Sequence, residues 1–187
     1  MLKDLNYPLA APSANITTRL SSVQASDVKD EFGSKIKYIL DGGKCNIGLE
    51  STIINLTLKP TILRLGGLDI TEIKKVLKKK IGLNINSKKR ISPGQSRLHY
   101  SPGIPLKTNV KKPKKNEAFL LIKKRKISLD NYYYLSKKSN LNEAAKNLYS
   151  LLRKIKNKGF KSISVEKIPD KGVGKTINDR LKRASKY

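Results

Sequence analysis

The chain has 187 residues, a hydrophobic share of 37% and a mean hydropathy of −0.49, which allows one medium domain or two small ones under a heavily charged surface. No apolar run reaches the length of a transmembrane helix, and residues 1–7 lack the apolar stretch of a signal peptide, so we expect no membrane partner. The single cysteine, Cys45, excludes an intramolecular disulfide and favours a reducing, cytoplasmic location. With one histidine, His99, the chain has too few ligands for a zinc site of its own, and we expect no metal bound by its side chains.

The net charge of +27 is distributed unevenly along the chain. Residues 1–70 hold eight basic and seven acidic side chains, whereas residues 71–187 hold thirty-three and seven. This change of character near Asp69 indicates two parts. A strongly basic part is typical of nucleic-acid binding, but an AT-rich genome would enrich Lys, Asn and Ile without any binding role, and both explanations stay open.

The first part alternates short apolar segments with Gly and Pro turns, which is typical of an α/β or α+β layer architecture. A helix is expected after Asp69, because Glu72 follows at capping-box spacing and an apolar stripe continues to Ile81. Pro60 separates two strands that are expected to form a hairpin. These two strands are expected at residues 51–56 and 61–65. Further strands are expected at residues 9–11 and 38–40, and a helix at residues 26–32.

The second part is preceded by residues 85–116, where Pro, Ser, Asn, Gly and Lys dominate and a linker is expected. Asn140 with Glu143 begins the strongest helical pattern, which Gly159 ends. Three strands and a last basic helix complete a compact three-layer α/β unit. These elements are expected at residues 118–122, 132–135, 162–165 and 177–185.

Several segments, taken in order, resemble one family. Residues 8–16, PLAAPSANI, are similar to a stretch of YrdC-domain proteins, and residues 41–53 and 61–66 resemble that family's DGG…G.EST and ILRPG segments, with Leu65 where proline is usual. Residues 92–102, with SPG and HYSP, resemble a linker found in the long form of threonylcarbamoyl-AMP synthases. The tail resembles that long form at residues 142–149 and 174–181.

The resemblance implies a fold and domain boundaries. Residues 1–84 would be the C-terminal part of a YrdC-like, twisted-sheet catalytic domain. Residues 85–116 would be a linker that acts as a lid, and residues 117–187 a small Rossmann-like α/β domain.

The resemblance also implies an activity. Such a synthase, an ATP-binding nucleotidyltransferase, converts ATP, L-threonine and bicarbonate into threonylcarbamoyl-AMP and pyrophosphate, and a partner enzyme transfers the threonylcarbamoyl group to tRNA. We expect ATP as a substrate, Mg²⁺ bridging its phosphates, and double-stranded RNA binding as a family property. No general base stands out, so the catalytic residues are left unassigned, and positioning with charge neutralisation is the expected mode.

The site residues follow from the matched motifs. Ser13, Ala14 and Asn15 would form a polar turn that offers donors to ATP, although these residue types also favour ordinary turns. Arg64 points away from its apolar neighbours and would bind phosphate or carboxylate, unless it is a solvated surface side chain. The remaining expectations are Ser21 and Tyr100 for ATP, and Ser51 and Thr52 for threonine.

The linker and Glu50 complete the interpretation. His99 and Tyr100 would fold over the site, exclude water and protect a labile mixed anhydride. The alternative is a linker that docks without touching ligand. Glu50 is interpreted as shaping its turn rather than binding a metal.

The family's domain begins well before PLAAPSAN, and that front half supplies further ATP and threonine contacts. We therefore expect the isolated chain to form an incomplete pocket. It could be one half of a split enzyme with a separate N-terminal half, the product of a frameshifted or misassigned gene start, or a repurposed fragment.

Two other functions stay open beside the enzyme. One is a basic RNA-binding module without catalysis, in which the lysine runs at 111–115 and 123–126 contact phosphates near the tyrosines at 132–134. The other is a fragment that completes another chain by strand addition.

Overall fold

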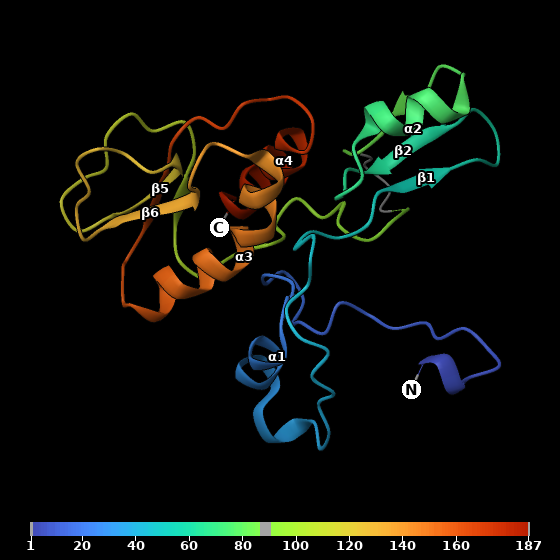
Figure 1. The fold of residues 1–187 in the computed structure, drawn as a ribbon, viewed down its shortest axis with the longest axis horizontal. Helices are drawn as coiled ribbons and strands as arrows, with labels where there is room; N and C mark the ends of the chain where they lie inside the picture. Colours follow the sequence, from blue (N-terminus) through green and yellow to red (C-terminus); the bar gives the residue numbers. More distant parts are fainter. Residues whose placement is uncertain (1, 87–90, 187) are drawn as a thin grey trace.

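A computed structural model describes residues 2–86 and 91–186. It has mixed α/β architecture, as the sequence predicts, with two sheets (Figure 1). The elements in chain order are the 3₁₀ turn η1 (Leu2–Asp4), α1 (Ala25–Phe32), the 3₁₀ turn η2 (Gly33–Lys35), β1 (Ile53–Asn55), β2 (Thr61–Arg64), α2 (Ile70–Leu77), β3 (Gly82–Leu83), β4 (Leu106–Lys107), β5 (Ala118–Lys123), β6 (Tyr132–Ser136), α3 (Leu141–Asn157), β7 (Ile163–Val165) and α4 (Gly174–Ala184).

The first sheet has the order β1-β2-β3. Strands β1 and β2 are antiparallel, with Ile54 opposite Ile62, which confirms the hairpin predicted around Pro60. Strand β3 adds to β2 in parallel and was not predicted. The buried core under this sheet is small, consisting of Ile62, Leu65 and Ile73 with partly buried neighbours.

Helix α2 begins as predicted, because the Asp69 side chain accepts a hydrogen bond of 2.9 Å from the Thr71 N–H. It ends at Leu77, earlier than the apolar stripe predicts. Lys78 has a left-handed backbone with φ of 47°, which stops the helix. The chain then passes Ile81 and enters β3.

The second sheet is parallel, with the order β4-β7-β5-β6. Helix α3 begins at the predicted cap, where the Asn140 side chain accepts from two backbone N–H groups. Leu148 of α3 and Leu181 of α4 belong to the same large core as Leu120 of β5, so both helices cover one face of this sheet. The described residues therefore do not show the helix layer on each face that the expected three-layer unit requires. Leu20, from the first part of the chain, also lies in this core.

Two predicted strands are wrong. Residues 9–11 and 38–40 have no strand partner in the described structure, and Tyr38 and Leu40 are 89% and 78% exposed. Figure 1 shows the segment of residues 2–14 (dark blue) extending away from the other elements. Local β propensity needs a neighbouring strand to become a sheet, and no strand of the described ranges pairs with these segments.

Two further elements differ from the sequence analysis. Strand β4 lies inside the segment expected to be a linker and pairs with β7. Helix α4 begins at Gly174, three residues before the predicted start. In the part of the chain that the structure describes, no helix is both long enough and apolar enough to span a bilayer.

We expect Leu148→Ala to lower the free energy of unfolding by about 2–5 kcal/mol, because it opens a cavity in the large core. Leu148 is 0% exposed, whereas Leu58 is 90% exposed. Leu58→Ala is therefore the matched control, with an expected change within about 0.5 kcal/mol. Urea denaturation measures both, and equal effects would contradict the assigned core.

Candidate active site

Three of the expected site residues meet at the end of β2. The Arg64 guanidinium donates to the Ser51 carbonyl oxygen at 3.0 Å and to the Ser51 hydroxyl oxygen at 3.1 Å. Gly94 has φ of +85°, and a Cβ there would lie 2.5 Å from the Tyr100 hydroxyl oxygen and 3.0 Å from Cδ of Arg64. Only a glycine fits between them. Ser51, Arg64, Gly94 and Tyr100 are called the arginine–tyrosine cluster below.

Tyr100 places an unused donor in this cluster. Its side chain is 1% exposed, and within the described residues its hydroxyl has no hydrogen-bond partner. Burial raises the pKa of Tyr100 to about 12, so the hydroxyl keeps its proton at neutral pH. A buried hydroxyl without a partner is costly, and a ligand oxygen would relieve that cost.

His99 holds the backbone of Tyr100. Its Nδ1 accepts a hydrogen bond of 3.0 Å from the Tyr100 N–H. Burial lowers the pKa of His99, and the nearby positive charges of Arg180, Arg183 and Arg64 act in the same direction. The imidazole is therefore neutral at pH 7, as an accepting Nδ1 requires.

A buried ion pair joins the two parts of the chain behind this cluster. The Glu50 carboxylate accepts from Nε of Arg180 at 2.9 Å, from the Ser21 hydroxyl at 2.5 Å and from the Tyr149 hydroxyl at 3.1 and 3.2 Å. Burial alone would raise the pKa of Glu50, but the Arg180 charge and the Ser21 hydrogen bond outweigh it, and the pKa is lowered. Glu50 with Arg180 is called the Glu50–Arg180 latch below.

Arg180 connects this latch to the cluster. It is 1% exposed, and its guanidinium carbon lies 4.5 Å from the centre of the Tyr100 ring, a cation–π contact. It also donates to the Leu65 carbonyl oxygen and to the Asp179 carboxylate, both at 2.6 Å. A single side chain of α4 thus contacts the end of β2, the turn at Glu50 and Tyr100.

The turn at residues 13–15 is linked to the latch through the residues that follow it. Ser13 donates to the Asn15 side chain at 2.5 Å, and Asn15 donates to the Arg19 carbonyl oxygen at 3.2 Å. Ala14, with φ of 49°, accepts from the Ser22 hydroxyl at 2.7 Å. Through residues 18–22 the turn reaches Ser21 and the latch.

The segment after Tyr100 is bonded to the residues that follow this turn. The Ser101 N–H donates to the Thr18 carbonyl oxygen at 2.8 Å, and Arg19 and Ser101 form an isolated β-bridge. Among the described residues, no hydrogen bond joins residues 13–15 directly to Arg64.

Ser51 and Thr52 have different hydrogen-bond roles. The Thr52 hydroxyl donates to the Leu68 carbonyl oxygen at 2.7 Å and holds the start of β1 against the turn at residues 66–68. The Ser51 oxygen accepts from Arg64, which leaves its own proton for a ligand. Of the two, Ser51 is the one with a hydroxyl proton free to donate.

Sequence reasoning missed the role of α4 and Tyr149. Tyr149, Asp179 and Arg180 lie in the matched tail segments but received no role. Glu50 shapes its turn, since its carbonyl oxygen accepts from the Gly67 N–H at 2.8 Å, but its carboxylate also carries the latch. In the described ranges, no group of three His, Cys, Asp or Glu residues is placed to hold a metal ion.

The fold and the cluster define a class of two-part α/β protein. Its small mixed sheet carries Arg64 and Ser51, and its parallel α/β unit holds the segment with Tyr100 against them. A family model described as "Threonylcarbamoyl-AMP synthase, C-terminal domain" matches residues 68–186, and one for Sua5, YciO and YrdC proteins described as "Telomere recombination" matches residues 1–66. The chain belongs to the threonylcarbamoyl-AMP synthase family.

Curated relatives agree with this assignment. The threonylcarbamoyl-AMP synthase of Pyrococcus abyssi is 34% identical over 96% of this chain, and that of Bacillus subtilis is 29% identical over 99%. The enzyme of Schizosaccharomyces pombe is 30% identical over 95%. The chain spans 58%, 59% and 52% of these relatives, respectively.

Solved structures agree as well. The crystal structure of P. abyssi Sua5 complexed with L-threonine superposes with a TM-score of 0.81 at 31% identity, over 94% of this chain and 57% of that one. A P. abyssi Sua5 variant, with a histidine and the next residue, a tyrosine, replaced by alanine, gives a TM-score of 0.76 at 30% identity, over 94% and 56%.

We expect Glu50→Gln to lower the free energy of unfolding at about pH 7 by about 1.5–3 kcal/mol, because it weakens charged hydrogen bonds in the latch. The folded pKa of Glu50 lies below its ordinary value of 4.5. The contribution of the carboxylate is therefore fully present above pH 4.5 and is lost as the pH falls through the folded pKa.

The difference between wild type and Glu50→Gln should accordingly narrow in urea denaturation below about pH 4.5. Glu72→Gln, at an exposed carboxylate beside Lys75, is the control and should change the unfolding free energy little at any pH. A difference that does not depend on pH would contradict the latch.

Proposed function

We propose that this chain carries the C-terminal part of the catalytic domain, the linker and the small domain of an L-threonylcarbamoyladenylate synthase. The reaction joins ATP, L-threonine and bicarbonate into threonylcarbamoyl-AMP, releasing pyrophosphate and water, and serves threonylcarbamoyladenosine formation in tRNA. Family membership supports the activity. The observation that carries the site is the convergence on Gly94 of Arg64 and the Tyr100 hydroxyl, which has no hydrogen-bond partner among the described residues.

ATP is the ligand proposed for the arginine–tyrosine cluster. A guanidinium has five N–H donors, and only two of those of Arg64 are used by Ser51. The others are available for phosphate, where planar paired donors bind strongly. The Tyr100 hydroxyl would donate to a neighbouring phosphate oxygen. In one P. abyssi structure a histidine and the tyrosine after it are replaced by alanine. This chain has a single histidine, His99, and Tyr100 follows it. We propose that His99 and Tyr100 are the corresponding pair.

The remaining contacts follow the matched motifs. Ser13, Ala14 and Asn15, with Ser21 behind them, are proposed to face the nucleotide. Ser51 and Thr52 are proposed to bind threonine, and the P. abyssi structure complexed with L-threonine supports that substrate. Because Thr52 already donates to Leu68, the direct contact falls to Ser51.

Mg²⁺ is proposed to arrive with ATP. The Glu50 carboxylate accepts from Ser21, Tyr149 and Arg180, so it is not free as a ligand. A Mg²⁺ ion coordinated by phosphates and water fits this donor set. The ion would neutralise charge on the phosphates, while Arg64 and Tyr100 orient them.

The exposed apolar segments indicate how the pocket could be completed. Tyr38 and Leu40, and Leu9 in the earlier segment, are exposed, and within the described ranges their backbone has no strand partner. Unpaired extended backbone readily accepts another strand. We propose that these segments pair with the part of the catalytic domain that the chain does not span, including a separate N-terminal half if one exists.

Location and partners complete the proposal. The single exposed cysteine, Cys45, fits a cytoplasmic location. The labile product requires a partner enzyme that transfers the threonylcarbamoyl group to tRNA. We keep the proposed domain boundaries: residues 1–84 as the catalytic part, residues 85–116 as the linker and residues 117–187 as the small domain.

The test is formation of a threonine-dependent AMP adduct from ATP, L-threonine and bicarbonate. We expect it when the chain is combined with the polypeptide that supplies the rest of the catalytic domain. Arg64→Ala should lower turnover by at least about tenfold, since one charged hydrogen bond to phosphate contributes about 1.5–3 kcal/mol.

Lys75→Ala, on the exposed face of α2, removes a cation that pairs with Glu72 and should leave turnover unchanged. Circular dichroism should show that both variants are folded. Absence of the adduct in the combined sample, or equal turnover of Arg64→Ala and wild type, would contradict the proposal.

A further inference from the structure

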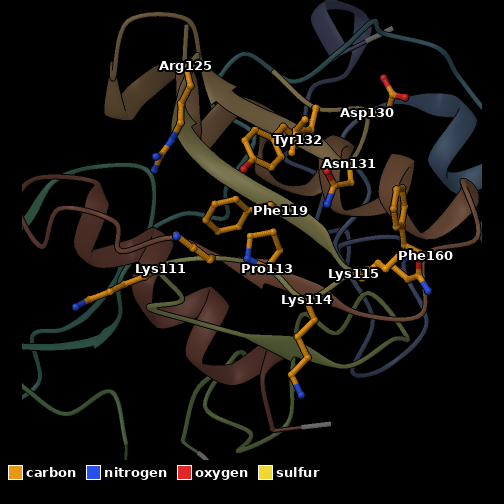
Figure 2. A pocket seen from close by; sticks show the side chains of 13 residues that line it. Lys111, Pro113, Lys114, Lys115, Phe119, Arg125, Asp130, Asn131, Tyr132 and Phe160 are labelled. Carbon is orange, nitrogen blue, oxygen red and sulfur yellow. The ribbon is translucent and has the colours of Figure 1, made fainter. Parts of the chain in front are cut away.

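A second, separate depression lies on the small parallel sheet. It has a cavity volume of about 770 Å³ and lies between the segment of residues 111–116 and the loop of residues 125–131 (Figure 2). Phe119 of β5 and Tyr132 of β6 are among the residues that line it. None of its lining residues belongs to the arginine–tyrosine cluster or to the latch.

The floor of this depression is aromatic. Side chains alternate along a strand, and Leu120 packs in the core under α3 and α4, so Phe119 lies on the opposite face. Phe119 is 1% exposed and meets the Tyr132 ring edge-on, with ring centres 5.5 Å apart. Tyr132 and Phe160 are each partly exposed. A buried ring thus supports a Tyr132 face that solvent can reach.

The rim of the depression is basic. It carries Lys111, Lys112, Lys114 and Lys115, all exposed. Among the residues that the structure describes, no carboxylate forms an ion pair with any of these four lysines. Asp130 also lines the depression, so the four lysines leave this rim with a net positive charge. Figure 2 shows Pro113 beside Phe119, with the Lys111 and Lys114 side chains extending outward from it.

The opposite side of the depression carries both signs of charge, because Asp130 and Arg125 both line it. Arg125 lines it and pairs with Glu166 at 2.9 Å, and Lys123, Lys124 and Lys126 next to it in sequence are exposed. An aromatic floor beside a lysine-rich rim is the combination that binds single-stranded nucleic acid, where bases stack and phosphates meet lysines.

We propose that this aromatic–lysine groove binds single-stranded RNA, with a base stacked on Tyr132 and successive phosphates beside the lysines of residues 111–115. The function lies beyond the synthase reaction and does not depend on it. The exposed lysines are spread along a segment rather than converging on one point, which suits a polyanion better than a small anionic metabolite. The aromatic floor suits an unpaired base better than a duplex, whose bases are stacked on each other.

The test is fluorescence anisotropy of a labelled oligouridine of roughly twelve nucleotides with the whole chain. We expect Tyr132→Ala to weaken binding about tenfold, as loss of one stacked base does, and Tyr132→Phe to retain it. Replacing the four lysines of residues 111–115 by glutamine should reduce the slope of log affinity against log salt by about 3, since each phosphate contact on a single strand contributes about 0.7.

The matched control replaces four exposed lysines near the end of α2, at positions 74, 78, 79 and 80, by glutamine. It removes the same charge from another surface and should change the affinity much less than the groove variant. Equal losses would mean that net charge alone binds RNA, and would overturn the proposal.

Two competitors complete the test. Duplex RNA or polyglutamate that competes as well as the oligouridine would also overturn the proposal, since neither offers an unpaired base. Selective loss of binding in the groove variant and in Tyr132→Ala, with circular dichroism unchanged, supports it. The four lysines are exposed, so that variant tests the groove even if Tyr132→Ala unfolds.

Discussion

The buried pair of Glu50 and Arg180 is the contact on which the arrangement of the two parts depends. Removing two charges from water is costly, and the cost is offset only when every hydrogen-bonding group finds a partner. Here Glu50 also accepts from Ser21 and Tyr149, and Arg180 also donates to Leu65 and Asp179. The latch is satisfied only when α4, β2 and the Glu50 turn are together.

The proposed nucleotide site inherits its geometry from that contact. Arg180 lies against the Tyr100 ring, so the latch holds that ring in position. The Tyr100 hydroxyl then lies beside Gly94 and Arg64. Leu20 enters the core of the second sheet, which ties the segment that follows Asn15 to the same unit. The two sheets therefore act together on the site, although only the second has a large core.

Local signals predicted the elements that depend on local chemistry. The Asn140 cap and the apolar spacing of α3 were sufficient to predict that helix, and the matched motifs indicated Arg64 and Tyr100 as residues of the proposed site. The two-residue strand β4 had no local signal, because it exists only through pairing with β7. Likewise, Glu50 and Arg180 are 130 residues apart, and nothing in either neighbourhood indicates their pairing. The Rossmann-like description of the small unit remains a prediction.

A double-mutant cycle tests the latch most directly. The free energy of unfolding would be measured by urea denaturation for wild type, Glu50→Gln, Arg180→Met and the double variant. A fully buried pair in one network should give a coupling energy of about 2–3 kcal/mol with a single shared transition. A coupling below about 0.5 kcal/mol, or separate transitions for the two parts in wild type, would contradict the view that this ion pair joins them around the site.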